Sequence, residues 1–134
     1  MPRRPDPTQR PTDAELAILN VLWRTGAATV RGVHEELPRG ARRGYTTTLK
    51  LMQIMAEKGL LARDTSRRSH VYSARSSARE VQERLVGDLL QRAFQGSSAR
   101  LVLRALSHEP ASPEELAEIR RVLDELEGRE GVPA

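Results

Sequence analysis

Apolar residues recur at helical spacing in three stretches of the amino-terminal half of the chain. The first, 16–23, follows a capping box, in which Thr12 accepts a backbone hydrogen bond and Glu15 reaches back to the start of the helix. The second stretch covers 30–37, and the third covers roughly 46–58. The pattern predicts three consecutive helices, and the first is expected to be central because it is apolar on most sides.

Two short runs that are typical of strands follow the third helix. They cover 60–64 and 70–74, and the loop between them carries Arg67 and Arg68. Three helices followed by a β-hairpin with a basic tip are the element order of a winged helix-turn-helix, in which the third helix enters the major groove of DNA. We therefore predict a mainly α fold with a small β-hairpin wing.

Helical spacing returns after residue 77 and continues almost to the end of the chain. A wide apolar stripe covers 81–94, a short apolar helix covers 99–106, and a second capping box at 112–115 leads into a last helix. These segments are too few and too apolar to stand alone, so we expect a homodimer; folding back onto the winged domain is the alternative. The expected dimer contacts are Val81, Leu85, Leu89, Phe94, Leu116, Ile119, Leu123 and Leu126.

These patterns divide the chain into four segments. Residues 1–11 hold four prolines among arginines and predict a disordered basic arm. Residues 12–76 form the expected DNA-binding domain, residues 77–128 the expected helical dimerisation region, and residues 129–134 a disordered tail.

Composition excludes several classes of function. The chain has no cysteine, so it has no disulfide and no thiolate for a metal or for nucleophilic catalysis. Its three histidines, His34, His70 and His108, lie on separate elements, and no phosphate loop or nucleophile motif is present, so we expect no catalytic site, no metal and no cofactor. No apolar run approaches the roughly 20 residues of a membrane span, so we expect a cytoplasmic protein without membrane insertion.

Charge is distributed unevenly along the chain. Residues 1–77 hold 14 Lys and Arg against 7 Asp and Glu, whereas residues 78–134 hold 8 against 11. Within 39–75, nine basic residues face only Glu57 and Asp64. A basic excess on a scaffold of this kind is the expected electrostatic footprint of a surface that meets phosphates, although a basic solvated face is the plainer interpretation of charge alone.

The third helix divides into an apolar arc and a polar arc. The apolar arc holds Thr48, Leu49, Met52 and Met55, while Ile54 is an aliphatic residue in the polar one. Side chains that donate and accept hydrogen bonds at short reach suit base edges, so we predict base contacts from the polar arc. The predicted base contacts are Thr46, Thr47, Lys50 and Gln53, and the predicted phosphate contacts are Arg42, Arg43, Tyr45, Arg67, Arg68 and His70.

Four motifs in this order resemble the penicillinase repressor family, whose members include BlaI, MecI and CopY. They are Thr12-Asp-Ala-Glu-Leu-Ala-Ile-Leu-Asn-Val-Leu-Trp23, Ala28-Thr-Val-Arg-Gly-Val-His-Glu-Glu-Leu37, Gly44-Tyr-Thr-Thr-Thr-Leu-Lys-Leu-Met-Gln-Ile-Met-Ala-Glu-Lys-Gly-Leu-Leu61 and Ser69-His-Val-Tyr72. The resemblance implies a homodimeric transcriptional repressor with a winged helix on palindromic operator DNA. In one branch of the family it also implies a membrane sensor protease that cleaves the repressor.

Three departures from the family pattern limit what the resemblance implies. Without cysteine, the thiolate copper sensing of another branch is excluded. Cleaved members carry Asn-Phe where this chain has Arg104-Ala105, and many members carry arginine where this chain has Ile54. The inducing signal and the operator sequence therefore do not carry over.

Two other functions remain as alternatives. One is a repressor that responds to a small ligand held between the winged domain and the dimer helices. The other is a winged-helix adaptor that binds proteins and never touches DNA, which the basic residues Lys50, Arg67 and Arg68 argue against.

Overall fold

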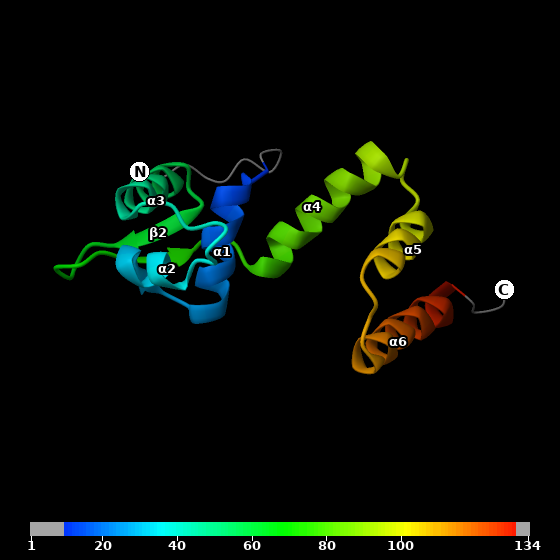
Figure 1. The fold of residues 1–134 in the computed structure, drawn as a ribbon. Helices are drawn as coiled ribbons and strands as arrows, with labels where there is room; N and C mark the ends of the chain where they lie inside the picture. The colour runs from blue at the N-terminus through cyan, green and yellow to red at the C-terminus, as the bar shows by residue number, and fades with distance from the viewer. Residues whose placement is uncertain (1–9, 131–134) are drawn as a thin grey trace. The chain divides into compact units, whose positions relative to one another are not determined.

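The computed structural model describes residues 10–130, and the chain forms two compact units that meet between Asp88 and Leu89. The first unit contains the three helices and the strands, and the second contains the last two helices (Figure 1). The boundary therefore lies inside α4 (Ala78–Ala93), later than the expected boundary at residue 77. Most of the predicted basic arm and residues 131–134 of the predicted tail lie outside the described residues.

Helix α1 (Asp13–Thr25) begins at the predicted capping box. The Glu15 backbone N–H donates to Thr12 Oγ1 at 3.1 Å, and the Thr12 backbone N–H donates to Glu15 Oε1 at 2.9 Å. The helix ends at Gly26, whose φ of 84° is readily available to glycine. The buried apolar residues of α1 are Ile18, Leu19, Val21 and Leu22, which confirms the central helix predicted from the sequence.

Removing the cap of α1 is expected to destabilise the first unit. Thr12→Ala leaves a helix-terminal N–H without its side-chain acceptor, which typically costs about 1 kcal/mol in the free energy of unfolding. Urea unfolding followed by the fluorescence of Trp23, the single tryptophan, measures this change. Thr47→Ala, at an exposed position inside a helix, is the matched control and is expected to leave stability unchanged; equal stability of both variants would contradict the prediction.

Helices α2 (Val30–Glu36) and α3 (Tyr45–Glu57) follow the predicted spans closely. Between them, His34 Nδ1 lies 2.9 Å from Thr48 Oγ1, and Thr48 is buried. At the other end of α3, Lys58 Nζ donates to Glu15 Oε2 at 3.0 Å, and this carboxylate is only 2% exposed. Polar contacts at both ends of α3 therefore fix its position against α2 and α1.

The strands form a three-stranded antiparallel sheet rather than an isolated hairpin. Strands β2 (Leu61–Asp64) and β3 (Val71–Ala74) pair as predicted, with Arg63 opposite Tyr72. A third strand, β1 (Ala28–Thr29), pairs with the other edge of β3, so the order is β1-β3-β2. Two residues are too short to show a strand period, so the sequence did not predict β1.

The core of the first unit lies between the three helices and the sheet. Tyr72 on β3 is 1% exposed and packs with buried residues from all three helices. The indole of Trp23 donates to the Ser76 carbonyl at 2.9 Å, which ties the chain leaving β3 to α1. Other members of this core are Val30, Val33, Leu37, Met52, Met55 and Leu61.

The second unit contains α5 (Ser98–His108) and α6 (Pro113–Glu130), and the end of α4 leads into it. Helix α6 begins at the predicted second capping box, because the Glu115 N–H donates to Ser112 Oγ and the Ser112 N–H donates to Glu115 Oε1. The hydrogen bonds that the backbone N–H and then the hydroxyl of Ser112 donate to the Glu115 carboxylate hold its pKa below its ordinary value. The helix continues through Glu130, so residues 129 and 130 of the predicted tail are helical.

Candidate nucleic-acid interface

Helix α3 presents the predicted polar face to solvent. Its buried residues are Thr48, Met52 and Met55, which lie on the predicted apolar arc. The opposite arc is exposed and carries all four predicted base contacts: Thr46, Thr47, Lys50 and Gln53. The division predicted from helical spacing is therefore confirmed, and the contacts themselves remain a prediction.

The exposed face of α3 is divided between two shallow hollows. One is lined by Thr46, Thr47, Lys50, Leu51 and Ile54 and has a volume of about 280 Å³. The other, of about 350 Å³, lies between α3, the start of α2 and the wing. Gln53 lines this second hollow together with Tyr45, Arg68 and His70, so it shares a surface with predicted phosphate contacts rather than with Lys50.

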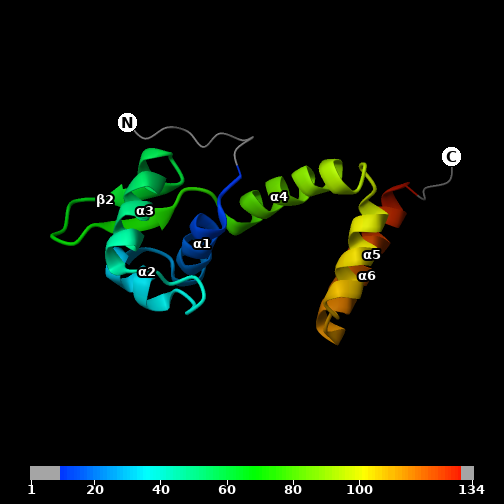
Figure 2. The same cartoon turned by 45° about the horizontal axis from the view of Figure 1, so that its top comes forward.

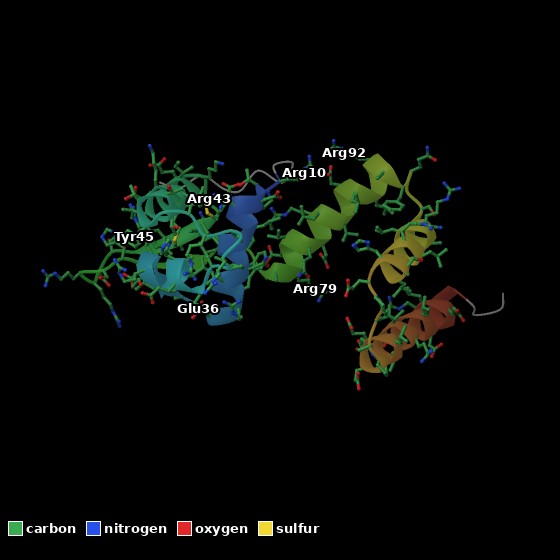
Figure 3. All side chains as sticks on the ribbon, viewed as in Figure 1. Arg10, Glu36, Arg43, Tyr45, Arg79 and Arg92 are labelled. Carbon is green, nitrogen blue, oxygen red and sulfur yellow. The ribbon has the colours of Figure 1, made fainter. Side chains whose placement is uncertain are left out.

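Tyr45, the first residue of α3, is held between two side chains of α2. The Arg31 guanidinium carbon lies 4.7 Å from the ring centroid of Tyr45, a cation–π contact. The His34 ring meets the same tyrosine edge to face, with centroids 5.7 Å apart. Tyr45 is 37% exposed and is labelled in Figure 3. Arg31, which supports Tyr45 from the preceding helix, was not predicted as a site residue from the sequence.

The two arginines of the loop between α2 and α3 differ in their contacts. Arg42 Nη2 donates to the carbonyl oxygens of Glu35 at 2.7 Å and Leu37 at 2.9 Å, where the last carbonyls of α2 need donors. Arg43, labelled in Figure 3, makes only longer contacts with backbone carbonyls of its own loop. Arg42 therefore has a structural role that the sequence did not reveal, and Arg43 is the more available of the two.

The wing carries an ordered turn before its basic tip. Asp64 Oδ1 accepts from the Ser66 hydroxyl at 2.7 Å and from the Ser66 backbone N–H at 2.9 Å. These bonds, with a smaller contribution from the charge of Arg67, hold the pKa of Asp64 below its ordinary value. Arg67, Arg68 and His70 are all exposed. In both views of the fold the loop that holds them projects beyond the helices of the first unit (Figures 1 and 2).

The second unit has an apolar groove between α5 and α6. No side chain described on these two helices is buried, although both helices carry apolar residues. Leu103 is 57% exposed, Leu123 49% and Leu126 48%. The groove has a volume of about 650 Å³, and its lining residues are Ser98, Ala99, Val102, Leu103, Glu118, Ile119, Val122, Leu123 and Leu126.

The predicted dimer contacts fall into three groups. Ile119, Leu123 and Leu126 line the groove. Another group is partly or fully exposed outside the groove lining: Leu85 and Leu89 on α4, Phe94 directly after α4, and Leu116 on α6. Val81 is only 4% exposed and belongs to the first unit, so it is part of a monomer core and its prediction as a dimer contact is corrected. The early turns of α4 pack with the winged unit, which helical spacing alone does not reveal.

Other kinds of site have little support among residues 10–130. No group of three acidic or histidine side chains there could hold a metal ion. No helix in this range is long and apolar enough to cross a membrane. His34 is half-buried and bonded to Thr48, so it is a packed histidine.

Comparisons with known proteins connect this geometry to a family. The family model for the penicillinase repressor matches residues 11–125. The chain is 34% identical over 122 residues to the transcriptional regulator BlaI of Mycobacterium tuberculosis, covering 89% of this chain and 86% of that protein. It is 25% identical over 118 residues to the penicillinase repressor of Bacillus licheniformis, covering 88% and 92%.

The family match extends over both units of the structure. It begins at the capping box of α1, covers the exposed face of α3 and the wing, and continues into α6. Members of this family are regulators of transcription rather than enzymes. The four ordered motifs, the winged first unit and the length of the match agree, and the chain belongs to the penicillinase repressor family.

Proposed function

We propose that this protein is a sequence-specific, DNA-binding transcriptional repressor. The observation that carries the proposal is the exposed polar face of α3 beside a projecting basic wing. Hydroxyl, amine and amide groups on α3 suit base edges, whereas the wing arginines suit phosphates, which position a protein without reading sequence. The names of the relatives, transcriptional regulator and penicillinase repressor, support the same role. A protein with this role acts where the DNA is, in the cytoplasm.

We further propose that the repressor is a homodimer on a palindromic operator. The apolar groove between α5 and α6 supports this, because large apolar side chains at 48–57% exposure favour burial against a partner. A two-fold dimer places two copies of α3 on related half-sites, so its operator is an inverted repeat. The second copy therefore buries the apolar groove and also supplies the α3 helix for the second half-site.

Selection of bound duplexes from a random pool tests this function directly. The expected result is an enriched inverted repeat that binds the full chain more tightly than random DNA at the same salt concentration. If no sequence is enriched and binding weakens steeply as the salt concentration rises, the protein binds DNA only through nonspecific attraction to phosphates. Failure to bind DNA at all would favour the protein-binding adaptor.

Induction by a sensor protease of the penicillin-responsive type is expected to fail at Arg104-Ala105. Both residues lie inside α5, and a protease needs extended backbone, so the helix must first open locally. A basic and a small residue also replace the Asn-Phe of cleaved members. Incubation with such a sensor and mass spectrometry of the products measures this, with a family member that carries Asn-Phe at this place as the matched substrate. Efficient cleavage between Arg104 and Ala105 would contradict the prediction.

A further inference from the structure

The exposed Ile54, on the outer face of α3, is a residue whose chemistry the proposed function leaves unexplained. It is 37% exposed, although an aliphatic side chain gains nothing from contact with water. It is one turn beyond Lys50 and two turns beyond Thr46, on the same stripe of the helix. The core side of the helix is already filled by Met52 and Met55.

The hollow around Ile54 has a mixed character that restricts its occupant. The half-buried Leu51 and the methyl groups of Thr46 and Thr47 extend the apolar surface, while Lys50 brings an ammonium group to the rim. Leu51 and Ile54 are the aliphatic residues of its lining, so the apolar part of the hollow is small. A stable protein interface buries on the order of 800 Å² of each partner, far more than one exposed isoleucine and its neighbours offer. The hollow therefore fits a single apolar group that is surrounded by polar ones.

We propose that Ile54 is a specificity-determining residue that contacts the C5-methyl group of a thymine in the major groove. This inference rests on the proposed function, because it needs α3 to lie in that groove. Among the four bases only thymine presents a methyl group there, and apolar side chains recognise it by excluding water from it. Cytosine presents an amino group at the neighbouring position, which an isoleucine leaves without a partner. Ile54 thus selects thymine. The ammonium group of Lys50 donates to the hydrogen-bond acceptors next to that methyl group.

Replacing thymine by deoxyuridine tests the contact, because this change removes only the methyl group. In the duplex enriched by the wild-type protein, each thymine is replaced in turn, and affinity is measured by fluorescence anisotropy. The wild type is expected to lose about fourfold in affinity for each critical methyl group, the change that corresponds to one buried methyl group. The sensitive thymine is expected at equivalent positions in the two half-sites.

Two variants assign the effect to Ile54. Ile54→Ser is expected to bind the thymine and deoxyuridine duplexes equally, whereas Ile54→Val, which keeps the apolar contact, is expected to retain discrimination. Thermal unfolding of both variants checks that the fold is intact, as expected at an exposed position. Ile54→Ser that still discriminates as strongly as the wild type would overturn the inference.

The outcomes separate this inference from the function on which it rests. Specific binding by the wild type without sensitivity to any deoxyuridine would overturn the role of Ile54 and leave the repressor intact. Absence of any preferred duplex would overturn both. Loss of discrimination in Ile54→Ser but not in Ile54→Val supports the thymine contact.

Discussion

Leu123→Asp is expected to convert the protein from a dimer to a monomer at micromolar concentration. Leu123 lines the groove between α5 and α6 and is 49% exposed in the single chain, so the proposed second copy covers it. An aspartate there would place an unpaired charge in an apolar interface, which costs on the order of several kcal/mol. Sedimentation velocity measures the change directly.

The same substitution is expected to weaken operator binding although it lies outside the DNA-binding unit. Two linked α3 helices benefit from a high effective concentration once the first half-site is bound, and a monomer loses that gain. Ala117→Asp is the matched control, because Ala117 is an exposed apolar residue of α6 outside the groove lining. It is expected to leave both dimerisation and binding unchanged. A wild-type protein that sediments as a monomer at micromolar concentration would refute the dimer itself.

Patterns among residues that are close in the sequence made most of the first unit predictable. The capping boxes at Thr12, in the first unit, and at Ser112, in the second, are four-residue patterns, and both form with the expected pairs of hydrogen bonds. The exposed arc of α3 follows from helical spacing, which depends only on 3.6 residues per turn. Local chemistry therefore gave the element order, and the element order gave the winged fold.

Features that depend on distant residues were missed. Strand β1 exists only because β3 accepts a partner on its second edge, and nothing in the two residues Ala28 and Thr29 indicates this. Arg42 was predicted to contact phosphate, and the sequence did not indicate that its guanidinium also completes the hydrogen bonding of α2. Val81 fits an amphipathic stripe, yet the winged unit buries it. In each case tertiary packing determined the role of a residue that the local pattern left open.

Lys50→Ala is expected to reduce affinity for the operator more than affinity for random DNA. Lys50 lies on the exposed arc of α3 with Thr46 and Thr47, where a base contact adds discrimination. Loss of the Lys50 side chain is expected to reduce the free-energy difference between operator binding and random binding by about 1–3 kcal/mol. Thr47→Ala is expected to act in the same direction but more weakly, because a hydroxyl contact is neutral. Fluorescence anisotropy with both kinds of duplex measures the difference.

Arg68→Ala is expected to weaken operator and random binding alike, since the wing contacts phosphates that every sequence presents. Arg68 is exposed beyond the Asp64–Ser66 turn, so its removal leaves the fold of the wing in place. The slope of log affinity against log salt is expected to fall by roughly 1 per subunit, because one fewer phosphate charge is neutralised and fewer counterions are released. If Lys50→Ala and Arg68→Ala instead lose specific and random binding in equal proportion, α3 does not read bases, and specificity must come from elsewhere on the protein or from the shape of the DNA.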